Sequence, residues 1–385
     1  MEKTSSWLEI EEGSLAERLS READAPGKPP WRRRALDFER NLRAILAPEL
    51  EVRRQGEEGV ALRWRAGVYE PEGTPRVFEA VVRRDPLLSI TTSNNPARAR
   101  RPRKLYSASR LSPALAGVDQ VCRPEECPFH STRIGTDPAG YLLVPGHCLR
   151  LGEEVVRLRV TSAKVNLYPS LPGQFVVLAA LDHHRRLAHR PVEETRETLR
   201  ALQWFHRVAR EEGTAKGLDL WVNEGALGFA TLPHPHWQVR PRFDWERHFI
   251  EPFPEPGMGA ALVRETLWSG RGFALALEPS LAELRLLARE PAPFDALDAV
   301  ELAEVLRRVD LAFERLGVSS YNFMVCAADF DREAGRLALI RIQAREEPYT
   351  SSNQAGLEFL HNGRFRMVAL DLERLREAVV AELNR

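Results

Sequence analysis

The sequence has few cysteines, no net charge and no long apolar run, and each lack excludes a class of protein. Four cysteines in 385 residues are too few and too scattered for a disulfide framework. Basic and acidic side chains number 55 each, which argues against general binding of nucleic acid. No segment approaches the roughly 20 apolar residues of a membrane span, and the polar first residues do not resemble a secretion signal. We therefore expect a cytoplasmic protein that binds neither nucleic acid nor a membrane.

The composition is otherwise that of an ordinary globular protein. Hydrophobic residues make up 43% of the chain and charged residues 29%. A chain of 385 residues exceeds one average domain, so two lobes or a duplicated fold are expected. The four cysteines are then expected to bind metal or to be buried; they are Cys122, Cys127, Cys148 and Cys326.

The most informative segment is residues 231–239, which reads Thr-Leu-Pro-His-Pro-His-Trp-Gln-Val. Side chains alternate faces on an extended strand, so His234, His236 and Gln238 are predicted to point the same way, opposite to Trp237. A His-x-His pair could bind a metal, but an amide is a poor metal ligand and a good donor to phosphate oxygen. Nucleophilic histidine chemistry on a phosphate suits all three residues.

The segment just before it is a strand-like run over residues 218–230. Its glycines, Gly225 and Gly228, allow a bend and a close approach of the backbone to a ligand. Together the pattern Asn-x-Gly-x-x-Gly-x-x-Thr-x-Pro-His-Pro-His-x-Gln, from Asn223 to Gln238, resembles the galactose-1-phosphate uridylyltransferase branch of the histidine-triad superfamily. That branch includes diadenosine tetraphosphate phosphorylases and nucleoside-diphosphate-hexose phosphorylases.

Two upstream segments occur in the order that the family has. The basic segment at residues 95–102 resembles an early family segment whose arginines hold substrate phosphates, and Arg98 and Arg101 are the matching positions. Guanidinium groups suit this task because they bind phosphate oxygens in pairs. The element Cys127-Pro-Phe-His130 resembles the family's Cys-Pro-Phe-Cys zinc element with imidazole in place of the second thiolate.

The resemblance implies a structural zinc ion. Its ligands would be Cys127, His130, His183 and His234, a tetrahedral set of the kind that zinc prefers. His184 is an alternative to His183, and Cys122 is a further candidate. The expected role of the metal is to fix the backbone around His234 so that the neighbouring His236 is held in position to react.

The resemblance also assigns roles in catalysis. His236 would be the nucleophile that attacks the α-phosphorus of a nucleotide. The amide of Gln238 would donate to a phosphoryl oxygen, and because an amide cannot relay a proton, transfer is favoured over hydrolysis. Asn223 and Thr231 match positions that contact the phosphates, although either residue type is also common in turns.

Secondary-structure signals surround this segment. Strands are predicted near residues 60–64 and 77–82, and a helix is predicted from the acidic Glu193 to a terminating Gly213. A second periodic helix is closed by Gly317, and a last helix runs from an N-cap at Asp371 to Leu383.

The second half of the sequence repeats the order of elements of the first. Residues 272–277 resemble residues 174–179, and residues 336–345 resemble the histidine-bearing strand. Superposing Gln343 on Gln238 places Arg341 at the position of His236, so the second copy has lost its histidines. Arg341 and Arg345 are candidates to meet an acceptor phosphate.

The sequence therefore predicts an α+β protein of two similar halves, each an antiparallel sheet with a helix. Residues 1–90 would be an N-terminal accessory region, 91–245 the first half with the active site, and 246–385 a second, degenerate half. The expected activity is nucleotidyl transfer from a nucleoside diphosphate sugar or dinucleoside polyphosphate to phosphate or a sugar 1-phosphate. A nucleotide phosphoester hydrolase and a non-catalytic nucleotide-binding protein are the alternatives, and a homodimer is left open.

Overall fold

The structure is a computed structural model whose described part extends from Trp7 to the C-terminus with several gaps. It describes residues 7–69, 74–85, 90–96, 129–130, 140–178, 186–225, 234, 236–248, 265–279, 283–326, 329–331, 338–345 and 371–385. Among these residues no helix is long and apolar enough to cross a membrane.

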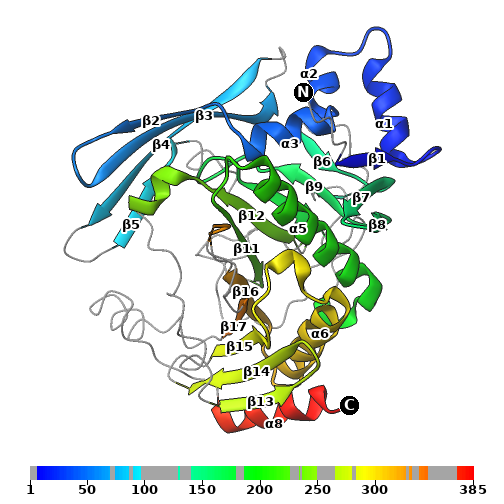
Figure 1. Ribbon diagram of the computed structural model, residues 1–385, viewed down its shortest axis with the longest axis vertical. Helices are drawn as coiled ribbons and strands as arrows, with labels where there is room; N and C mark the ends of the chain where they lie inside the picture. Colours follow the sequence, from blue (N-terminus) through cyan, green and yellow to red (C-terminus); the bar gives the residue numbers. More distant parts are fainter. Residues whose placement is uncertain are drawn as a thin grey trace.

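A ten-stranded antiparallel sheet forms the centre of the molecule (Figure 1). From one edge to the other its strands are β13 (Glu265–Ser269), β14 (Phe273–Glu278), β15 (Glu283–Ala288), β17 (Leu339–Arg345), β16 (Ser320–Cys326), β11 (Gly217–Glu224), β12 (His236–Arg242), β10 (Phe175–Leu178), β9 (Ser162–Val165) and β6 (Tyr141–Leu143).

The strand order confirms the prediction of two similar halves. The halves meet at the pair β11 and β16, and outward from this pair the order is β12, β10, β9 on one side and β17, β15, β14 on the other. One detail of the predicted repeat is wrong. Residues 273–277 of this run belong to β14, which occupies the place of β9, whereas β15 occupies the place of β10. Both β14 and β15 are short apolar runs, so the sequence could not show which of them pairs with β17, the counterpart of β12.

Two long helices, α5 (Val192–Glu212) and α6 (Ala299–Arg315), pack against each other on one face of this sheet (Figure 1). Both end as the sequence predicts, because Gly213 and Gly317 adopt φ values of 83° and 77° that favour glycine. The side chain of Asp298 caps the start of α6 by accepting from the backbone N–H groups of Val300 and Glu301.

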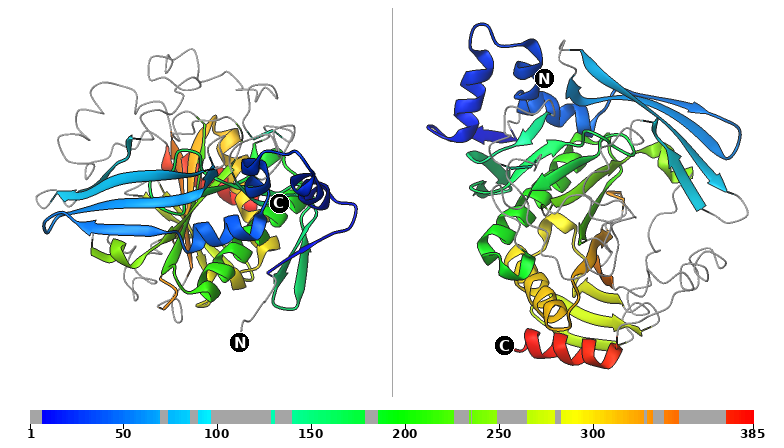
Figure 2. Two further views of the ribbon diagram at one scale, coloured as in Figure 1. Left: turned by 90° about the horizontal axis from the view of Figure 1, so that it is seen from above. Right: turned by 180° about the vertical axis from the view of Figure 1, so that it is seen from behind.

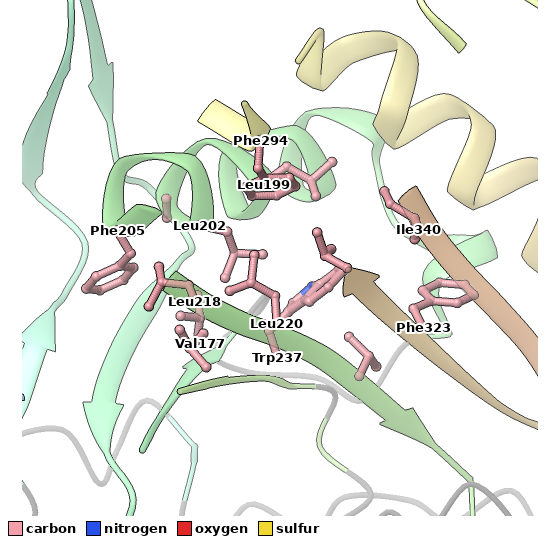
Figure 3. Close-up of a cluster of buried hydrophobic side chains, with 14 of the residues drawn as sticks. Val177, Leu199, Leu202, Phe205, Leu218, Leu220, Trp237, Phe294, Phe323 and Ile340 are labelled. Atoms are coloured by element: carbon pink, nitrogen blue, oxygen red, sulfur yellow. The ribbon is translucent and has the colours of Figure 1, made fainter. Parts of the chain in front are cut away.

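The hydrophobic core lies between these helices and the sheet (Figure 3). Leu199 and Leu202 of α5 belong to the same buried cluster as Leu220 of β11 and Trp237 of β12. Burial of each such side chain contributes about 1.5 to 3 kcal/mol. Because alternate residues of a strand face opposite sides, the side chains between these core residues are directed to the other face of the sheet. That other face therefore carries His236 and Gln238.

The N-terminal residues form three helices and contribute strands to two smaller sheets beside the first half (Figure 2). The helices are α1 (Leu15–Asp24), α2 (Pro30–Ala35) and α3 (Phe38–Leu46). One sheet joins β1 (Leu8–Ile10) to β7 (His147–Leu151) and β8 (Glu154–Arg157); the other joins β2 (Leu50–Arg54), β3 (Gly59–Tyr69), β4 (Pro75–Asp85) and β5 (Ile90–Asn94).

This N-terminal region shares the main hydrophobic core. Leu42 and Ile45 of α3 and Trp64 of β3 belong to the same cluster as Val165 of β9. The strands predicted within residues 60–64 and 77–82 are confirmed as parts of β3 and β4. At the opposite end of the molecule α8 (Leu372–Leu383) packs on α6 and β13, with Asp371 as the predicted N-cap.

Candidate active site

The strand β12 presents His236 and Gln238 on the face of the sheet away from the helices. His236 is the first residue of the strand, and Gln238 pairs with Val176 of β10 on one side and with Trp221 of β11 on the other. The predicted strand was thus too long at its N-terminal end, since His234 lies in a bend before it. The proline-rich stretch before His236 explains the difference, because proline cannot donate a hydrogen bond to a neighbouring strand.

The two imidazoles nevertheless share one neighbour, the ring of Phe129. This ring lies edge-on to His236 at 5.0 Å and to His234 at 5.8 Å between ring centroids. Both histidines are buried. Phe129 and His130 are the described residues of the Cys-Pro-Phe-His element, and the structure places the Phe129 ring beside the His-x-His pair.

A backbone hydrogen bond fixes the protonation pattern of the neutral His236 ring. Nδ1 of His236 lies 2.8 Å from the carbonyl oxygen of His234. A carbonyl oxygen can only accept, so Nδ1 carries the proton and the lone pair of the neutral ring is on Nε2. A ring held this way has its nucleophilic nitrogen on the side opposite to the bond.

The amide of Gln238 is held by a second glutamine. Nε2 of Gln174 donates to Oε1 of Gln238 at 2.9 Å. Oε1 of Gln174 in turn accepts from the backbone N–H and from the hydroxyl of Ser170, each at 2.7 Å. Gln174 is buried in the loop between β9 and β10.

The second half contributes to the same face through β16. The register pairs Val222 with Trp237, which places Asn223 beside His236. Asn223 also faces Asn322 of β16, whose Nδ2 donates to Oδ1 of Asn223 at 2.8 Å. A row of polar side chains thus runs from His236 across the junction of the two halves.

Arg341 does not continue this row. It pairs with Met324, and its guanidinium donates through Nε and Nη2 to one carboxylate oxygen of the buried Glu283, with the Nε contact at 2.7 Å. Gln343 faces Asn322 as His236 lies beside Asn223, so Gln343, not Arg341, occupies the place of His236. The predicted superposition is wrong by two residues. Because Arg341 is already held by a carboxylate, the structure does not support its predicted role as an acceptor phosphate clamp.

An ion pair between the half-buried Arg186 and the buried Asp310 links the two halves of the protein. Arg186 donates from Nε to Asp310 of α6 at 2.8 Å and from Nη2 to the carbonyl oxygen of Val318 at 2.8 Å. The other oxygen of Asp310 accepts from the backbone N–H of Ala188 at 2.7 Å. These hydrogen bonds therefore tie residues 186–188 to the second half.

The end of β11 is also fixed against the second half. Glu224 is buried near Arg190 and Tyr321, and burial raises the pKa of Tyr321 well above its usual value, which keeps its hydroxyl neutral. Gly225 follows with φ of 71°, and a Cβ there would lie 2.2 Å from the hydroxyl of Ser320. The predicted bend at Gly225 is confirmed, and both its backbone conformation and its surroundings require glycine.

Several predicted site residues lie outside the described part of the chain. These are Arg98, Arg101, Cys122, Cys127, His183, His184 and Thr231. Of the four predicted zinc ligands, the described residues include His130 and His234, so the zinc site stays a prediction. The structure brings together His234, His236, Gln238 and Asn223.

Three neighbours of the site were not singled out from the sequence. They are Gln174, Asn322 and Lys164, a buried residue of β9 whose Nζ lies 5.0 Å from the centroid of the Phe129 ring. A polar residue within an otherwise apolar stretch is the only local signal for Lys164 and Gln174. Asn322 had no signal, since its relation to Asn223 depends on the pairing of β11 with β16.

The fold is similar to those of solved uridylyltransferase structures. A uridylyltransferase mutant has 16% identity and a TM-score of 0.52, with 79% of this chain and 98% of that chain covered. Another uridylyltransferase structure has 18% identity and a TM-score of 0.50 at the same coverage. An ADP-glucose phosphorylase from Arabidopsis thaliana with bound ADP-glucose has 18% identity and a TM-score of 0.49, with 78% and 97% covered.

No family model matches the sequence, and no curated protein is significantly similar to it. The similarity to the two uridylyltransferase structures shows that the chain has their fold, which confirms the fold that the resemblance predicts. Identities this low show a shared fold, and the chemistry has to be argued from the site.

Proposed function

We propose that the protein is a nucleotidyltransferase that passes a nucleoside monophosphate through a covalent intermediate on His236. The observation that carries this proposal is the hydrogen bond between Nδ1 of His236 and the carbonyl oxygen of His234. It leaves the lone pair of the neutral ring on Nε2, the state that a nitrogen nucleophile needs. The donor would be a nucleoside diphosphate sugar or a dinucleoside polyphosphate.

The transfer would take two steps. In the first, Nε2 of His236 forms a bond to the α-phosphorus while the bond to the bridging oxygen breaks, and the rest of the donor leaves with that oxygen. In the second, an oxygen of inorganic phosphate or of a sugar 1-phosphate attacks the phosphorus, and the nitrogen–phosphorus bond breaks. Dividing the reaction in this way lets one phosphate leave before another binds.

Gln238 favours this reaction over hydrolysis. Its amide can donate to a phosphoryl oxygen and so stabilise the charge that develops there. It cannot take a proton from water, as a third imidazole could. A nucleotide phosphoester hydrolase is for this reason the weaker alternative. A non-catalytic nucleotide-binding protein would not need the hydrogen bond that sets the His236 ring.

The remaining parts of the proposal concern phosphate and metal binding. Arg98, Arg101, Asn223 and Thr231 would hold the phosphates, and zinc on Cys127, His130, His183 and His234 would support the site without taking part in the chemistry. The contacts of the Phe129 ring with both imidazoles support this proposal, since Phe129 directly precedes His130 in the sequence. One cysteine and one histidine separated by two residues are a ligand pair that suits zinc.

The experiment is a search for the adduct. The protein is incubated with nucleotide donors labelled at the α-phosphate, and the label on the protein is tested for lability in acid and stability in base, as expected for a phosphoramidate. His236→Gly should abolish the adduct and the overall transfer while nucleotide binding persists, because the other phosphate ligands remain. Gln238→His should let water compete as the acceptor.

The control is His189→Gly, the same substitution at an exposed histidine outside the proposed set of reacting residues, whose ring contacts Glu314 of α6. This variant should still form the adduct. The proposal fails if no donor that binds gives an adduct, or if His236→Gly turns over at the wild-type rate. Binding without an adduct would instead favour the non-catalytic alternative.

A further inference from the structure

The loop between β9 and β10 contains a glutamine that does not belong to the set of reacting residues, yet it is bonded to one of them. Gln174 is 2% exposed and follows Gly173, whose φ of 73° suits glycine. The loop is held from outside by β5 and the residue after it, because the hydroxyl of Ser93 donates to the carbonyl oxygen of Ser170 at 3.2 Å and Nδ2 of Asn95 donates to that of Pro169 at 2.7 Å. The backbone of the loop that carries Gln174 is therefore held in place by hydrogen bonds.

The hydrogen bonds of Gln174 determine which way its amide points. A backbone N–H can only donate, so the atom of Gln174 that meets the N–H of Ser170 at 2.7 Å must be the oxygen. The other branch, the NH₂ group, then faces Gln238. An NH₂ group can only donate, so Gln238 must meet it with its own oxygen, as the 2.9 Å contact shows.

This chain of bonds has a consequence for the substrate side of Gln238. With Oε1 of Gln238 engaged by Gln174, the group that Gln238 can offer to a ligand is its NH₂, which only donates. A phosphoryl oxygen only accepts. The two therefore match, whereas an amide turned the other way would direct a carbonyl oxygen at the phosphate.

We propose that Gln174 is a positioning residue that sets the amide of Gln238 to donate to the phosphoryl group of the nucleotide. The inference rests on the proposed function, since it assumes that Gln238 contacts the transferred phosphate. It assigns a role in the reaction to the loop at residues 166–174. It also explains why a polar side chain is buried directly before the apolar strand β10.

Gln174→Glu tests the inference with a change of one group. The rate is measured at a pH high enough to ionise this buried carboxyl group, because a protonated one could still donate to Gln238. One oxygen of the ionised group still accepts from Ser170 and the other can also only accept, so Gln238 must turn its NH₂ toward residue 174 and its oxygen toward the phosphate. Loss of one donor to a developing negative charge lowers rates by about 100-fold or more. Formation of the adduct in single turnover should fall by at least that factor, and donor affinity by much less, because the contact strengthens as charge develops.

Two further variants separate orientation from charge and from folding. Gln174→Met removes the donor without forcing the amide to turn, so its rate should lie between those of the wild type and Gln174→Glu. Asn166→Asp makes the same amide-to-acid change in the same loop, at a side chain whose Oδ1 accepts from the backbone N–H of Tyr168 at 2.9 Å. An acid can accept equally well there, so this control should keep the wild-type rate. Thermal melting of each variant reports its folding.

The possible results distinguish the two proposals. If the wild type forms the adduct and Gln174→Glu forms it equally fast, the inference is wrong and the proposed function stands. If Gln174→Met or Asn166→Asp loses as much rate as Gln174→Glu, orientation is not the cause and the inference is also wrong. If the wild type forms no adduct with any donor that it binds, the proposed function fails and takes the inference with it.

Discussion

His147 should make the stability of the protein fall between pH 6.5 and about 4. It lies on β7, fully buried, with its ring edge-on to Phe38 at 4.4 Å between centroids. Nδ1 of His147 lies 3.0 Å from both the backbone nitrogen and the carbonyl oxygen of Val144, and among the described residues Nε2 of His147 has no hydrogen-bond partner. Burial lowers the pKa of His147 to about 4, because the charged ring cannot be solvated there.

The sign and size follow from proton linkage. A lowered pKa means that the unfolded chain binds a proton at pH values where the folded protein does not, so stability is fully present above pH 6.5 and is lost as the pH falls. Each pH unit in this window costs about 1.4 kcal/mol. Between pH 7 and pH 5 this histidine should therefore remove about 2 kcal/mol of the free energy of unfolding.

The assay is urea unfolding of the wild type and His147→Asn at pH 7 and pH 5, followed by tryptophan fluorescence. Asparagine places Oδ1 where Nδ1 was, so the N–H of Val144 keeps an acceptor and no group titrates. Carboxylates that protonate in both proteins cancel in the comparison. The variant should lose about 2 kcal/mol less than the wild type; equal losses in both proteins would refute this account of His147.

Two other predictions concern the ties around the site. Asp310→Asn should lower the free energy of unfolding by about 3 kcal/mol, because it leaves the half-buried Arg186 without its countercharge. The double variant Arg186→Met/Asp310→Leu should recover most of this loss in the same unfolding assay; no recovery would mean that packing rather than charge is responsible. Elemental analysis should find about one zinc per chain, retained in His236→Ala and lost in His130→Ala; loss of the metal in His236→Ala would place it in the chemistry instead.

The helices and strands were largely predictable because their signals are local. Apolar spacing identified α6, and Gly213 and Gly317 marked the ends of both long helices through a backbone conformation that favours glycine. Asp371 was recognised as a cap by its side chain, which accepts from two backbone N–H groups in the first turn of α8. The alternation around His236 and Gln238 likewise follows from strand geometry within a few residues.

What the sequence alone determined about the site was its central strand, where alternation within one segment places His236 and Gln238 on the same face. Only the tertiary structure decided the partners of these residues. Asn322 lies 99 positions from Asn223, and Gln174 lies 64 positions from Gln238. Such contacts depend on which strands pair and in which register, and short apolar strands such as β14 and β15 carry no local signal for that choice. The direction of an amide depends in turn on every group that it meets, so the orientation of Gln238 became apparent only in the folded chain.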